Sequence, residues 1–393
     1  MLARPEHAFD ADNHYYEAED AFIRHVDPKM RSRCMRWAEV DGKARLLVGG
    51  KINRFIPNPT FDPCARPGAL NDLFRGKATI TDLASGFGEL EPVRPAYRDP
   101  AARLRMLDEQ GLDGALLFPT LGVGMEGALS GDRPALLAAF TGFNRWLLDD
   151  WTFDYQGRLF AAPYLSLADI DWAVSELEHA LDHGAKVINL RPGPIGDPAG
   201  NRSFGHRSHD PFWARVDEAG ITVAFHAGDA GYGFMLREWG VNPDFQAFRL
   251  PMLFQLLTMS PISDTIASLL ADGVFSRFPG IRVATIENGA EWVGPLFAKL
   301  KKAYQMRAAR WSEDPRETFR RHVWVSPFYE DDLADLARLI GTDRIIFGSD
   351  WPHAEGLADP LSYIEDLDAA GYSPADADKV MYANTASLVA PAT

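Results

Sequence analysis

Short apolar runs rich in β-branched and aromatic residues recur along the chain, and most of them are followed by a stretch with helical periodicity. Most of these runs are apolar on both faces, which is typical of parallel strands buried on both sides. The pattern predicts eight strands, at residues 8–14, 114–119, 159–167, 186–192, 221–228, 282–289, 322–328 and 344–352.

Helices are predicted between these runs. Asp99-Pro100 is a helix-cap residue followed by proline in the first turn, and Gly111 marks the end of that helix. The predicted helices cover residues 99–110, 134–151, 167–183, 211–219, 262–278, 290–310, 331–340, 360–370 and 373–388. A strand followed by a helix eight times predicts a TIM-type (β/α)8 barrel in the α/β class. The alternative is an open doubly wound sheet, but its first turn would lack the glycine-rich phosphate fingerprint.

Two long insertions interrupt this rhythm within what we interpret as a single domain spanning residues 1–393. Residues 15–97 separate the first strand from its helix, and the Asp41-Gly42 pair within them predicts a hairpin among loops. Residues 229–261 follow the fifth strand and are rich in Gly, Phe, Met and Trp. Both insertions leave the C-terminal ends of strands, where barrel active sites lie. They are therefore expected to form lids over the site or contacts between subunits.

Composition limits the classes of partner. The chain has 393 residues, 46% of them hydrophobic, and a net charge of −15, which argues against nucleic acid or an anionic membrane as a partner. Two cysteines, Cys34 and Cys64, exclude a disulfide scaffold and a thiolate-rich metal site. The first twelve residues lack a signal-peptide core, and no apolar run approaches the roughly 18 residues of a membrane span. We expect a cytoplasmic protein with a small-molecule substrate.

Polar side chains gather at the predicted strand exits. Asp10, Asp12 and His14 alternate along the end of the first strand, so they should share one face. His226 ends the fifth strand, Glu287 the sixth, and Asp350 with His353 the eighth. Because strand ends converge on one mouth, and buried carboxylates usually require a compensating cation, these groups predict a mononuclear metal site. The predicted ligands are Asp12, His14, His226 and Asp350, and mixed imidazole and carboxylate donors suit zinc or manganese.

Further residues near this mouth are candidates for binding or catalysis. Arg191 could hold a substrate carboxylate or pair with an acid such as Glu287, and Glu17 could be a weak ligand or a loop carboxylate. His353 could contact substrate, orient Asp350 or cap a loop. An aromatic wall or ordinary core packing is predicted for Trp292, Phe328, Tyr329 and Trp351. His206 and His209 are expected to be exposed loop residues rather than mouth residues, and His322 is expected to be structural.

Several segments resemble the amidohydrolase superfamily, in the branch of aminocarboxymuconate semialdehyde and resorcylate decarboxylases. They are Asp12-Asn13-His14, YRDPAARLRMLDEQGLDGALLFP at 97–119, Phe225-His226, and the most specific one, IIFGSDWPH at 345–353. The resemblance covers essentially the whole chain and implies a metal-dependent barrel enzyme, with a homodimer common in the branch.

Three departures from the family pattern affect the prediction. Many relatives have His-x-His on the first strand, whereas this chain has Asp12-x-His14; the resorcylate type has Glu-x-His with one metal. Glu287 stands where relatives commonly have a histidine on the sixth strand. The fourth strand ends in Asn189-Leu190-Arg191 without a lysine, so a binuclear centre bridged by a carbamylated lysine is not expected.

Three functions remain open on this basis. The first is non-oxidative decarboxylation of a small aromatic or cyclic carboxylated compound, with Asp350 as the acid that protonates carbon. The second is hydrolysis of an amide, lactone or similar bond by metal-activated water, with Asp350 as the general base. Glu287 would take part in either reaction, with Arg191, Trp351 and Tyr329 binding the substrate. The third is a barrel that binds a ligand without catalysis.

Overall fold

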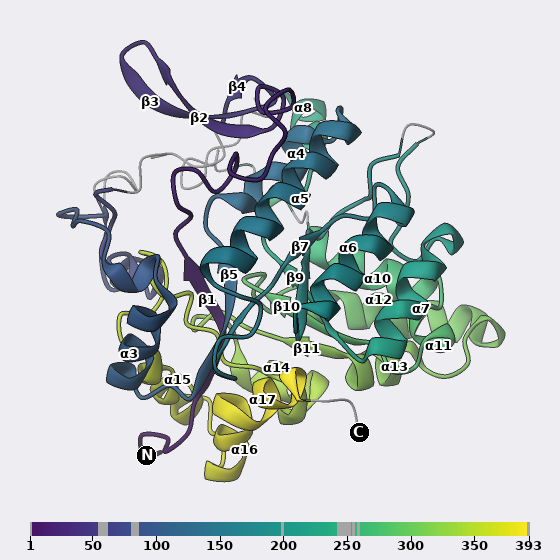
Figure 1. Ribbon diagram of the computed structural model, residues 1–393. Coiled ribbons are helices and arrows are strands. Elements are labelled where there is room, and N and C mark those ends of the chain that lie inside the picture. The colour runs from purple at the N-terminus through teal and green to yellow at the C-terminus, as the bar shows by residue number, and fades with distance from the viewer. Residues whose placement is uncertain are drawn as a thin grey trace.

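A ring of parallel strands forms the centre of the molecule (Figure 1). The computed structural model describes residues 2–53, 62–79, 86–197, 200–241, 253, 256, 257 and 260–390. The strands of the ring are β1 (Phe9–Tyr15), β5 (Gly114–Pro119), β6 (Leu159–Ala161), β7 (Tyr164–Leu165), β8 (Val187–Leu190), β9 (Thr222–His226), β10 (Arg282–Ile286) and β11 (Val323–Val325).

Backbone hydrogen bonds close these strands into a barrel. The sheets β1-β5-β6 and β7-β8-β9-β10-β11 meet where Ala162 and Pro163 join β6 to β7 as one interrupted strand, since proline has no N–H to donate. On the other side, Ile346 N–H donates to the Val325 carbonyl at 3.0 Å, and Ala11 N–H donates to the Phe347 carbonyl at 2.8 Å. The predicted TIM-type barrel is therefore confirmed.

The eighth barrel position differs from the prediction of a regular strand at 344–352. Only single bridges form there, from Ile345 to Val325 and from Trp351 to Asn13. The chain turns at Asp350, whose φ of 54° lies in the left-handed region, so the ladder cannot continue. This irregular segment carries the most specific motif of the sequence.

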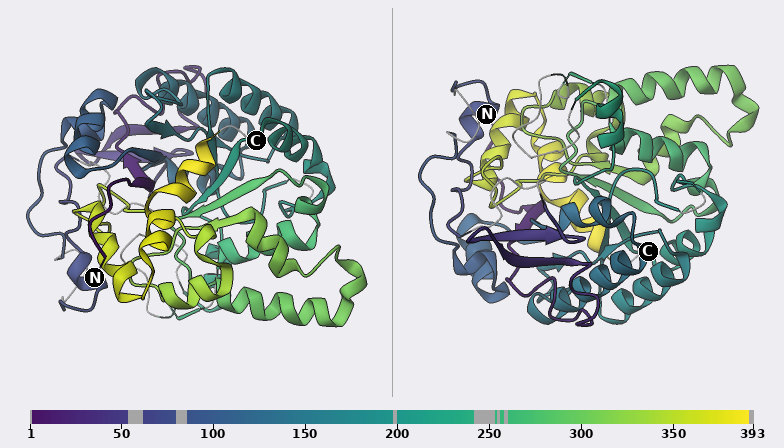
Figure 2. Two further views of the ribbon diagram at one scale, coloured as in Figure 1. Left: turned by 90° about the horizontal axis from the view of Figure 1, so that it is seen from below. Right: turned by 90° about the horizontal axis from the view of Figure 1, so that it is seen from above.

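Helices surround the barrel and close one end of it (Figure 2). The α-helices are α1 (Asn71–Phe74), α3 (Pro100–Gln110), α4 (Met125–Leu129), α5 (Arg133–Asp150), α6 (Ile170–Asp182), α7 (Asp210–Ala219), α8 (Gly233–Glu238), α10 (Pro261–Ala271), α11 (Val274–Arg277), α12 (Val293–Arg307), α13 (Pro315–His322), α14 (Leu333–Ile340), α15 (Tyr363–Ala369), α16 (Pro374–Asp378) and α17 (Asn384–Val389). Short 3-10 turns are η1 (Pro95–Tyr97), η2 (Gly122–Gly124), η3 (Arg207–His209), η4 (Ala308–Arg310), η5 (Thr342–Arg344) and η6 (Pro360–Ser362), and η7 (Lys379–Ala383) is a π-helical turn.

Two predicted helices are divided and several were not predicted. The stretch 262–278 splits into α10 and α11 at Gly273, whose φ of 70° ends the first helix. The stretch 373–388 splits at the π-helical turn η7. The helices α1, α4, α8 and α13 lie in segments where no helix was predicted; α1, α4 and α8, of four to six residues, are too short for periodicity to reveal.

The interior of the barrel is filled by apolar side chains, and α17 covers its lower end. Phe9, Leu116, Phe160 and Trp324 belong to this interior cluster, which Leu388 of α17 joins from below. Thr222 Oγ1 donates to the Leu388 carbonyl at 2.6 Å and fixes the helix to β9. The opposite end, where the strands finish, is therefore the end at which a site can form.

The first insertion places an antiparallel sheet of β2 (Met35–Val40), β3 (Lys43–Val48) and β4 (Lys51–Ile52) above the barrel (Figure 1). Asp41 and Gly42 form its turn with φ of 53° and 70°, the combination that a two-residue hairpin requires. Residues 54–61, 80–85 and most of 242–259 within the two insertions lie outside the described residues, so lid and interface both stay predictions. No described helix is long and apolar enough to cross a membrane.

Candidate metal centre and active site

Strand β1 delivers Asp12 and His14 to the upper end of the barrel, but it does not deliver Asp10. The pairing of β1 with β5 shifts register between Asp10 and Asn13, so the simple alternation is broken there. The Asp10 carboxylate accepts hydrogen bonds from the Asn13 amide at 2.9 Å and from Ser349 N–H at 2.9 Å. Asp10 therefore joins β1 to the segment before Asp350 and supports the site from below.

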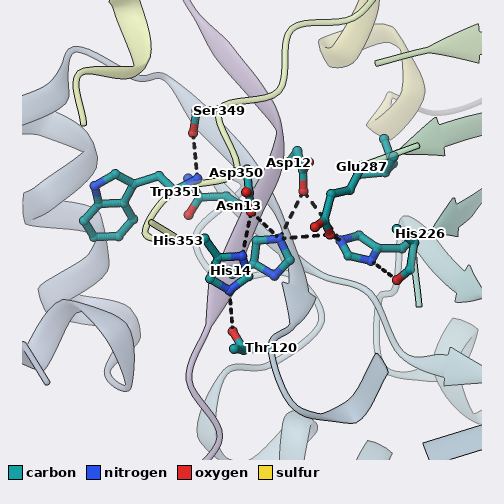
Figure 3. A network of polar contacts seen from close by, with 12 residues as sticks. Asp12, Asn13, His14, Thr120, His226, Glu287, Ser349, Asp350, Trp351 and His353 are labelled. Atoms are coloured by element: carbon teal, nitrogen blue, oxygen red, sulfur yellow. Dashed lines mark hydrogen bonds and ion pairs between the residues drawn. The ribbon is translucent and has the colours of Figure 1, made fainter. Parts of the chain in front are cut away.

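Three side-chain atoms from two strands point at one another (Figure 3), and they form ion-pair contacts but no hydrogen bonds. They are Asp12 Oδ1, His14 Nε2 and His226 Nε2, and their residues are 3%, 0% and 1% exposed. Asp12 Oδ1 lies 3.3 Å from His14 Nε2 and 3.6 Å from His226 Nε2. Polar atoms buried this deeply without hydrogen bonds are costly unless a further group occupies the space between them.

Both imidazoles are held in the orientation that a metal ligand needs. His14 Nδ1 lies 3.3 Å from the Pro119 carbonyl, and His226 Nδ1 lies 2.8 Å from the Ala227 carbonyl. A carbonyl can only accept, so each Nδ1 carries its proton and each Nε2 is left with a lone pair when the ring is neutral.

Asp350 and Glu287 complete the ring around these nitrogens. Asp350 Oδ1 lies 3.2 Å from His14 Nε2, and Glu287 Oε2 lies 3.1 Å from His226 Nε2. Both residues have left-handed backbone conformations, with φ of 54° and 55°. Such conformations cost about 1–3 kcal/mol each and persist where surrounding contacts enforce them. The Asn288 side chain supports the left-handed conformation of Glu287 by donating hydrogen bonds to the Phe225 and Ile286 carbonyls.

The buried acids and imidazoles of the cluster shift one another's pKa values. Burial by itself would raise the pKa of Asp12, but its contacts with His14 and His226 hold that pKa below the usual value. Burial would lower the pKa of His14, yet Asp12 and Asp350 raise it. Burial and the Asp350 carboxylate raise the pKa of Glu287 well above its usual value. Protons thus supply the positive charge between these acids, and a divalent cation could supply it instead.

The donor set fits one divalent cation. Asp12, His14 and His226 offer ligand atoms that all lie within 4.8 Å of one another, and His14 and Asp350 share a second such group. Two imidazoles and two carboxylates form a mixed donor set suited to zinc or manganese. The four residues predicted from the sequence are therefore brought together by β1, β9 and the segment after β11.

His353 forms a relay with Asp350 and Thr120. Thr120 Oγ1 donates to the Tyr15 carbonyl at 2.8 Å, so His353 Nε2, 3.1 Å away, must be the donor to that hydroxyl oxygen. His353 Nδ1 then lies 2.6 Å from Asp350 Oδ1, a contact that requires one proton between the two atoms. The pair can hold a proton beside the metal ligands.

A cavity of about 230 Å³ opens next to the cluster. Its lining comprises Asp12, Phe74, Glu287, Ser326, Pro327, Phe328, Tyr329, Glu330, Gly348, Ser349, Asp350, Glu355 and Gly356. Larger hollows of about 440 and 420 Å³ lie elsewhere on the surface and contain none of the clustered residues. Tyr329, predicted to bind substrate, is in the lining, and so is Phe328.

Glu355 belongs to the site and was missed from the sequence. One ligand atom of Glu355 lies within 4.8 Å of those of Glu287, Asp350 and His353. Burial, followed by the neighbouring Asp350, raises the pKa of Glu355 to about 8. The available signal was its position two residues after His353 in the same loop.

Two predicted substrate-binding residues face elsewhere. Arg191 Nε lies 3.2 Å from Glu126 Oε2, and its Nη atoms donate to the Asp229 and Pro194 carbonyls. Arg191 therefore pairs with Glu126 of α4, which lies at the end of β8, and not with the predicted partner Glu287. Trp351 is 2% exposed, and its ring points away from the cluster (Figure 3). The centre of this ring lies 4.6 Å from the Arg103 guanidinium carbon.

Other candidates have structural partners. Glu17 accepts from the backbone amides of Leu121 and Gly122, so it caps a turn and is not placed as a metal ligand. His206 bonds to Ser208 on the surface, whereas His209, expected to be exposed, is 2% exposed and faces the Phe204 carbonyl. The remaining two are buried: Trp292 donates to the Gly289 carbonyl, and His322 faces the Ile281 carbonyl.

Comparison with known proteins decides the family. A family model described as Amidohydrolase matches residues 10–389. The chain belongs to the amidohydrolase family. This agrees with the resemblance of its motifs, and it identifies the chain as an enzyme, so the interpretation as a barrel without catalysis is set aside.

Solved structures share the fold along the whole chain. An amidohydrolase from Mycobacterium avium subsp. paratuberculosis K-10 is 42% identical, with 98% of this chain and 99% of that chain covered and a TM-score of 0.91. A dihydroxybenzoic acid decarboxylase from Polaromonas sp. JS666 with bound manganese is 15% identical, with 97% and 96% covered and a TM-score of 0.58. The 5-carboxyvanillate decarboxylase of Sphingomonas paucimobilis is 14% identical, with 98% and 99% covered and a TM-score of 0.57.

Proposed function

We propose that this amidohydrolase binds one zinc or manganese ion through Asp12, His14, His226 and Asp350 and hydrolyses an amide, lactone or similar bond in a small molecule. The observation that carries the proposal is the convergence of three buried ligand atoms that lack hydrogen-bond partners, Asp12 Oδ1, His14 Nε2 and His226 Nε2. Asp350 and Glu287 flank these atoms at 3.2 Å and 3.1 Å from the two imidazoles.

The side chains divide the work of hydrolysis. A divalent ion bound there would polarise the scissile carbonyl and make water acidic enough to attack at neutral pH. Asp350 would accept the proton of the attacking water while its pair with His353 is unprotonated, and the 2.6 Å contact between them would then hold that proton. The same pair returns the proton to the leaving group. Glu287, whose pKa is raised by burial and by Asp350, donates a hydrogen bond to the reacting oxygen when it is protonated.

The charge of the cavity favours hydrolysis over decarboxylation. Five carboxylates line the cavity, and none of its described lining residues is Lys or Arg. Arg191, the arginine predicted to hold a substrate carboxylate, is paired with Glu126 instead. A substrate carboxylate would thus depend on the ion alone, whereas a neutral amide or ester avoids the repulsion.

Decarboxylation of an aromatic or cyclic acid is the second candidate. Five of the similar solved structures are decarboxylases of dihydroxybenzoate or carboxyvanillate. The Asp350–His353 pair could also deliver a proton to carbon as carbon dioxide leaves. Glu287, in the position of the family's usual sixth-strand histidine, would have to act as a neutral acid in this reaction.

Metal content tests the site. Elemental analysis of purified protein should find one equivalent of zinc or manganese, and His226→Ala should lose most of it. His206→Ala removes an exposed imidazole from the same chain and should keep the metal. Protein without stoichiometric metal, or full occupancy in the His226 variant, would contradict the proposal.

Turnover separates the two reactions. The metal-loaded enzyme is given a panel of amides and lactones and a panel of hydroxybenzoates, with acid release and carbon dioxide release measured. Asp350→Asn should lower either activity by about a hundredfold or more, because it removes the group that accepts the proton in hydrolysis or delivers it in decarboxylation. Carbon dioxide release without any hydrolysis would replace the first candidate by the second.

A further inference from the structure

The cavity contains more acidic side chains than one divalent ion takes as ligands in the proposed set. Asp12 and Asp350 are the two carboxylates of the proposed ligand set, which leaves Glu287, Glu330 and Glu355 in the lining. No described lining residue carries a positive charge. Arg75 lies nearby, 4.5 Å from the Tyr329 ring, but its guanidinium pairs with Asp366 at 2.6 Å and 2.8 Å. A positively charged group on whatever occupies the cavity would be stabilised by the ionised forms of these three acids, whereas an anionic group would be repelled.

The walls beside these acids are aromatic. Phe74 and Phe328 line the cavity and are 39% and 40% exposed, so both rings are accessible to a ligand there. The Phe328 ring is set against Gly289, where an added Cβ would lie 2.8 Å from it, and the Phe328 N–H donates to Asp331 at 2.8 Å. Tyr329 donates its hydroxyl to the Glu355 carbonyl at 3.1 Å. Tyr329 thus joins the segment that carries Phe328 to the loop that carries Glu355.

A second metal ion is the simpler occupant to consider, but the donors do not suit it. Glu287, Asp350, His353 and Glu355 have ligand atoms within 4.8 Å of one another. However, both ring nitrogens of His353 are engaged, with Asp350 and with Thr120, and Asp350 already faces His14. What remains is two glutamates beside exposed aromatic rings, a combination that recognises an organic cation through charge and the ring faces.

We propose that the substrate carries a protonated amine, and that Glu355 and Glu330 bind this ammonium group against the aromatic wall formed by Phe74, Phe328 and Tyr329. The subsite lies in the same cavity as Asp12 and Asp350, so the bond to be cleaved would lie a short distance from the ammonium group. A cavity of about 230 Å³ is below the roughly 300 Å³ of common ligand pockets, so the substrate is small. The proposal rests on the proposed function for the reaction itself, but not for recognition of the cation.

Three probes of nearly equal shape test the charge preference. Dissociation constants of para-fluorobenzylamine, para-fluorobenzyl alcohol and para-fluorobenzoate are measured by fluorine NMR, with zinc-loaded protein and with chelator-treated protein. The amine, which is cationic at neutral pH, should bind about tenfold more tightly than the alcohol, since hydrogen bonds to charged groups contribute this much. Equal binding of amine and alcohol, or tightest binding of the benzoate in the chelator-treated protein, would overturn the proposal.

Variants assign the preference to the two glutamates. Glu355→Gln should reduce amine affinity about tenfold and leave alcohol affinity unchanged. Glu330→Lys, at an exposed position of the cavity rim, should weaken amine binding and strengthen benzoate binding even if Glu355→Gln folds poorly. Glu365→Gln removes an exposed carboxylate from α15, outside the cavity, and should match the wild type. An amine-to-alcohol ratio unchanged in both cavity variants would overturn the assignment.

Metal stoichiometry distinguishes the remaining outcomes. Two equivalents of metal, one of them lost in Glu355→Gln, would replace the ammonium group by a second ion and overturn the inference. One equivalent together with the amine preference supports both the inference and the proposed function. An amine preference in protein that binds no metal would overturn the proposed hydrolysis alone.

Discussion

At the scale of single residues, several features of this amidohydrolase that are unfavourable for folding occur together at the candidate metal centre. Asp12, His14 and His226 bury polar atoms that lack hydrogen-bond partners, and Glu287 and Asp350 adopt left-handed backbone conformations. Each feature is unfavourable for folding alone. Their coincidence at the upper end of the barrel is the physical sign of a site maintained for binding and chemistry.

Asp331 offers a test of burial at the edge of the cavity. One of its carboxylate oxygens accepts from Phe328 N–H and Ala290 N–H, both at 2.8 Å, and burial raises its pKa to about 6. A raised pKa favours the folded state below about pH 4, and this contribution is lost as the pH rises through 6. Asp331→Asn keeps an accepting oxygen and has no charge to bury.

Between about pH 4 and 6, the wild type should therefore lose up to about 3 kcal/mol of unfolding free energy relative to Asp331→Asn. Urea denaturation at a series of pH values measures the difference. Asp182→Asn, at an exposed position of α6, should track the wild type. A constant difference between the Asp331 variant and the wild type across this range would contradict the expectation.

At the scale of elements, the loop after β11 depends on β1 and α3. Arg103 of α3 is fully buried and donates to the Ala96 and His14 carbonyls, both at 2.6 Å, and to the Asn13 side chain. Asn13 donates to Asp10, and Asp10 binds Ser349. A chain of buried hydrogen bonds thus links the helix to the residue before Asp350.

Arg103→Lys tests this chain. A lysine keeps the charge but cannot present the planar fork that reaches three acceptors, so buried oxygens lose their partner. The variant should lose about 3 kcal/mol of unfolding free energy. Its zinc dissociation constant should also be larger, because the metal ligands would be misplaced. Arg105→Lys, at an exposed position of the same helix, should change neither quantity. Unaltered zinc affinity in Arg103→Lys would show that the chain does not position the site.

Gly356 allows a second test of the loop. A Cβ at this position would lie 2.5 Å from the Asp350 carbonyl oxygen and 2.6 Å from the Ser349 carbonyl oxygen, so the backbone around Asp350 must move. Gly356→Ala should cut turnover at least tenfold, because a misplacement of about 1 Å has large catalytic consequences. Gly131→Ala, where an added Cβ meets nothing within 4 Å, should retain activity. Full activity in the Gly356 variant would exclude a fixed role for this loop conformation.

At the scale of the whole molecule, the site joins the two ends of the ring. Asp12 and His14 come from β1, His226 from β9 and Asp350 from the irregular segment that closes the barrel against β1. A ligand bound by all of them stabilises the folded barrel, because the unfolded chain cannot assemble these groups.

Metal removal should therefore lower the melting temperature. At a hundredfold excess of free metal over its dissociation constant, binding adds about 2.7 kcal/mol to the unfolding free energy. Calorimetry of chelator-treated protein should show a melting temperature a few degrees lower, restored by zinc or manganese. His226→Ala should melt at the same temperature with and without metal, whereas a large metal effect in that variant would place the ion elsewhere.

Much of the barrel could be predicted from the sequence, since buried parallel strands and capped helices have local signatures. The unpredicted parts have long-range causes. Residues 344–352 were predicted to be a strand, yet the backbone turns at Asp350, whose φ of 54° interrupts the strand ladder. Arg191 looked free to bind substrate, but Glu126 comes from a short helix that no periodicity revealed. Trp351 looked like a wall of the mouth, but its ring packs on Arg103.

The amino-acid sequence by itself determined the repeating strand-helix order, the family, and the presence of acids and histidines at the strand exits, because these depend on residue type and local spacing. Only the tertiary structure decided which of these side chains converge. A register shift in β1 takes Asp10 out of the cluster, and the loop after His353 brings Glu355 into it. The tertiary structure also decided the charge of the cavity, which depends on which arginines are already paired. Charge pairing acts through space, over distances that no spacing along the chain encodes.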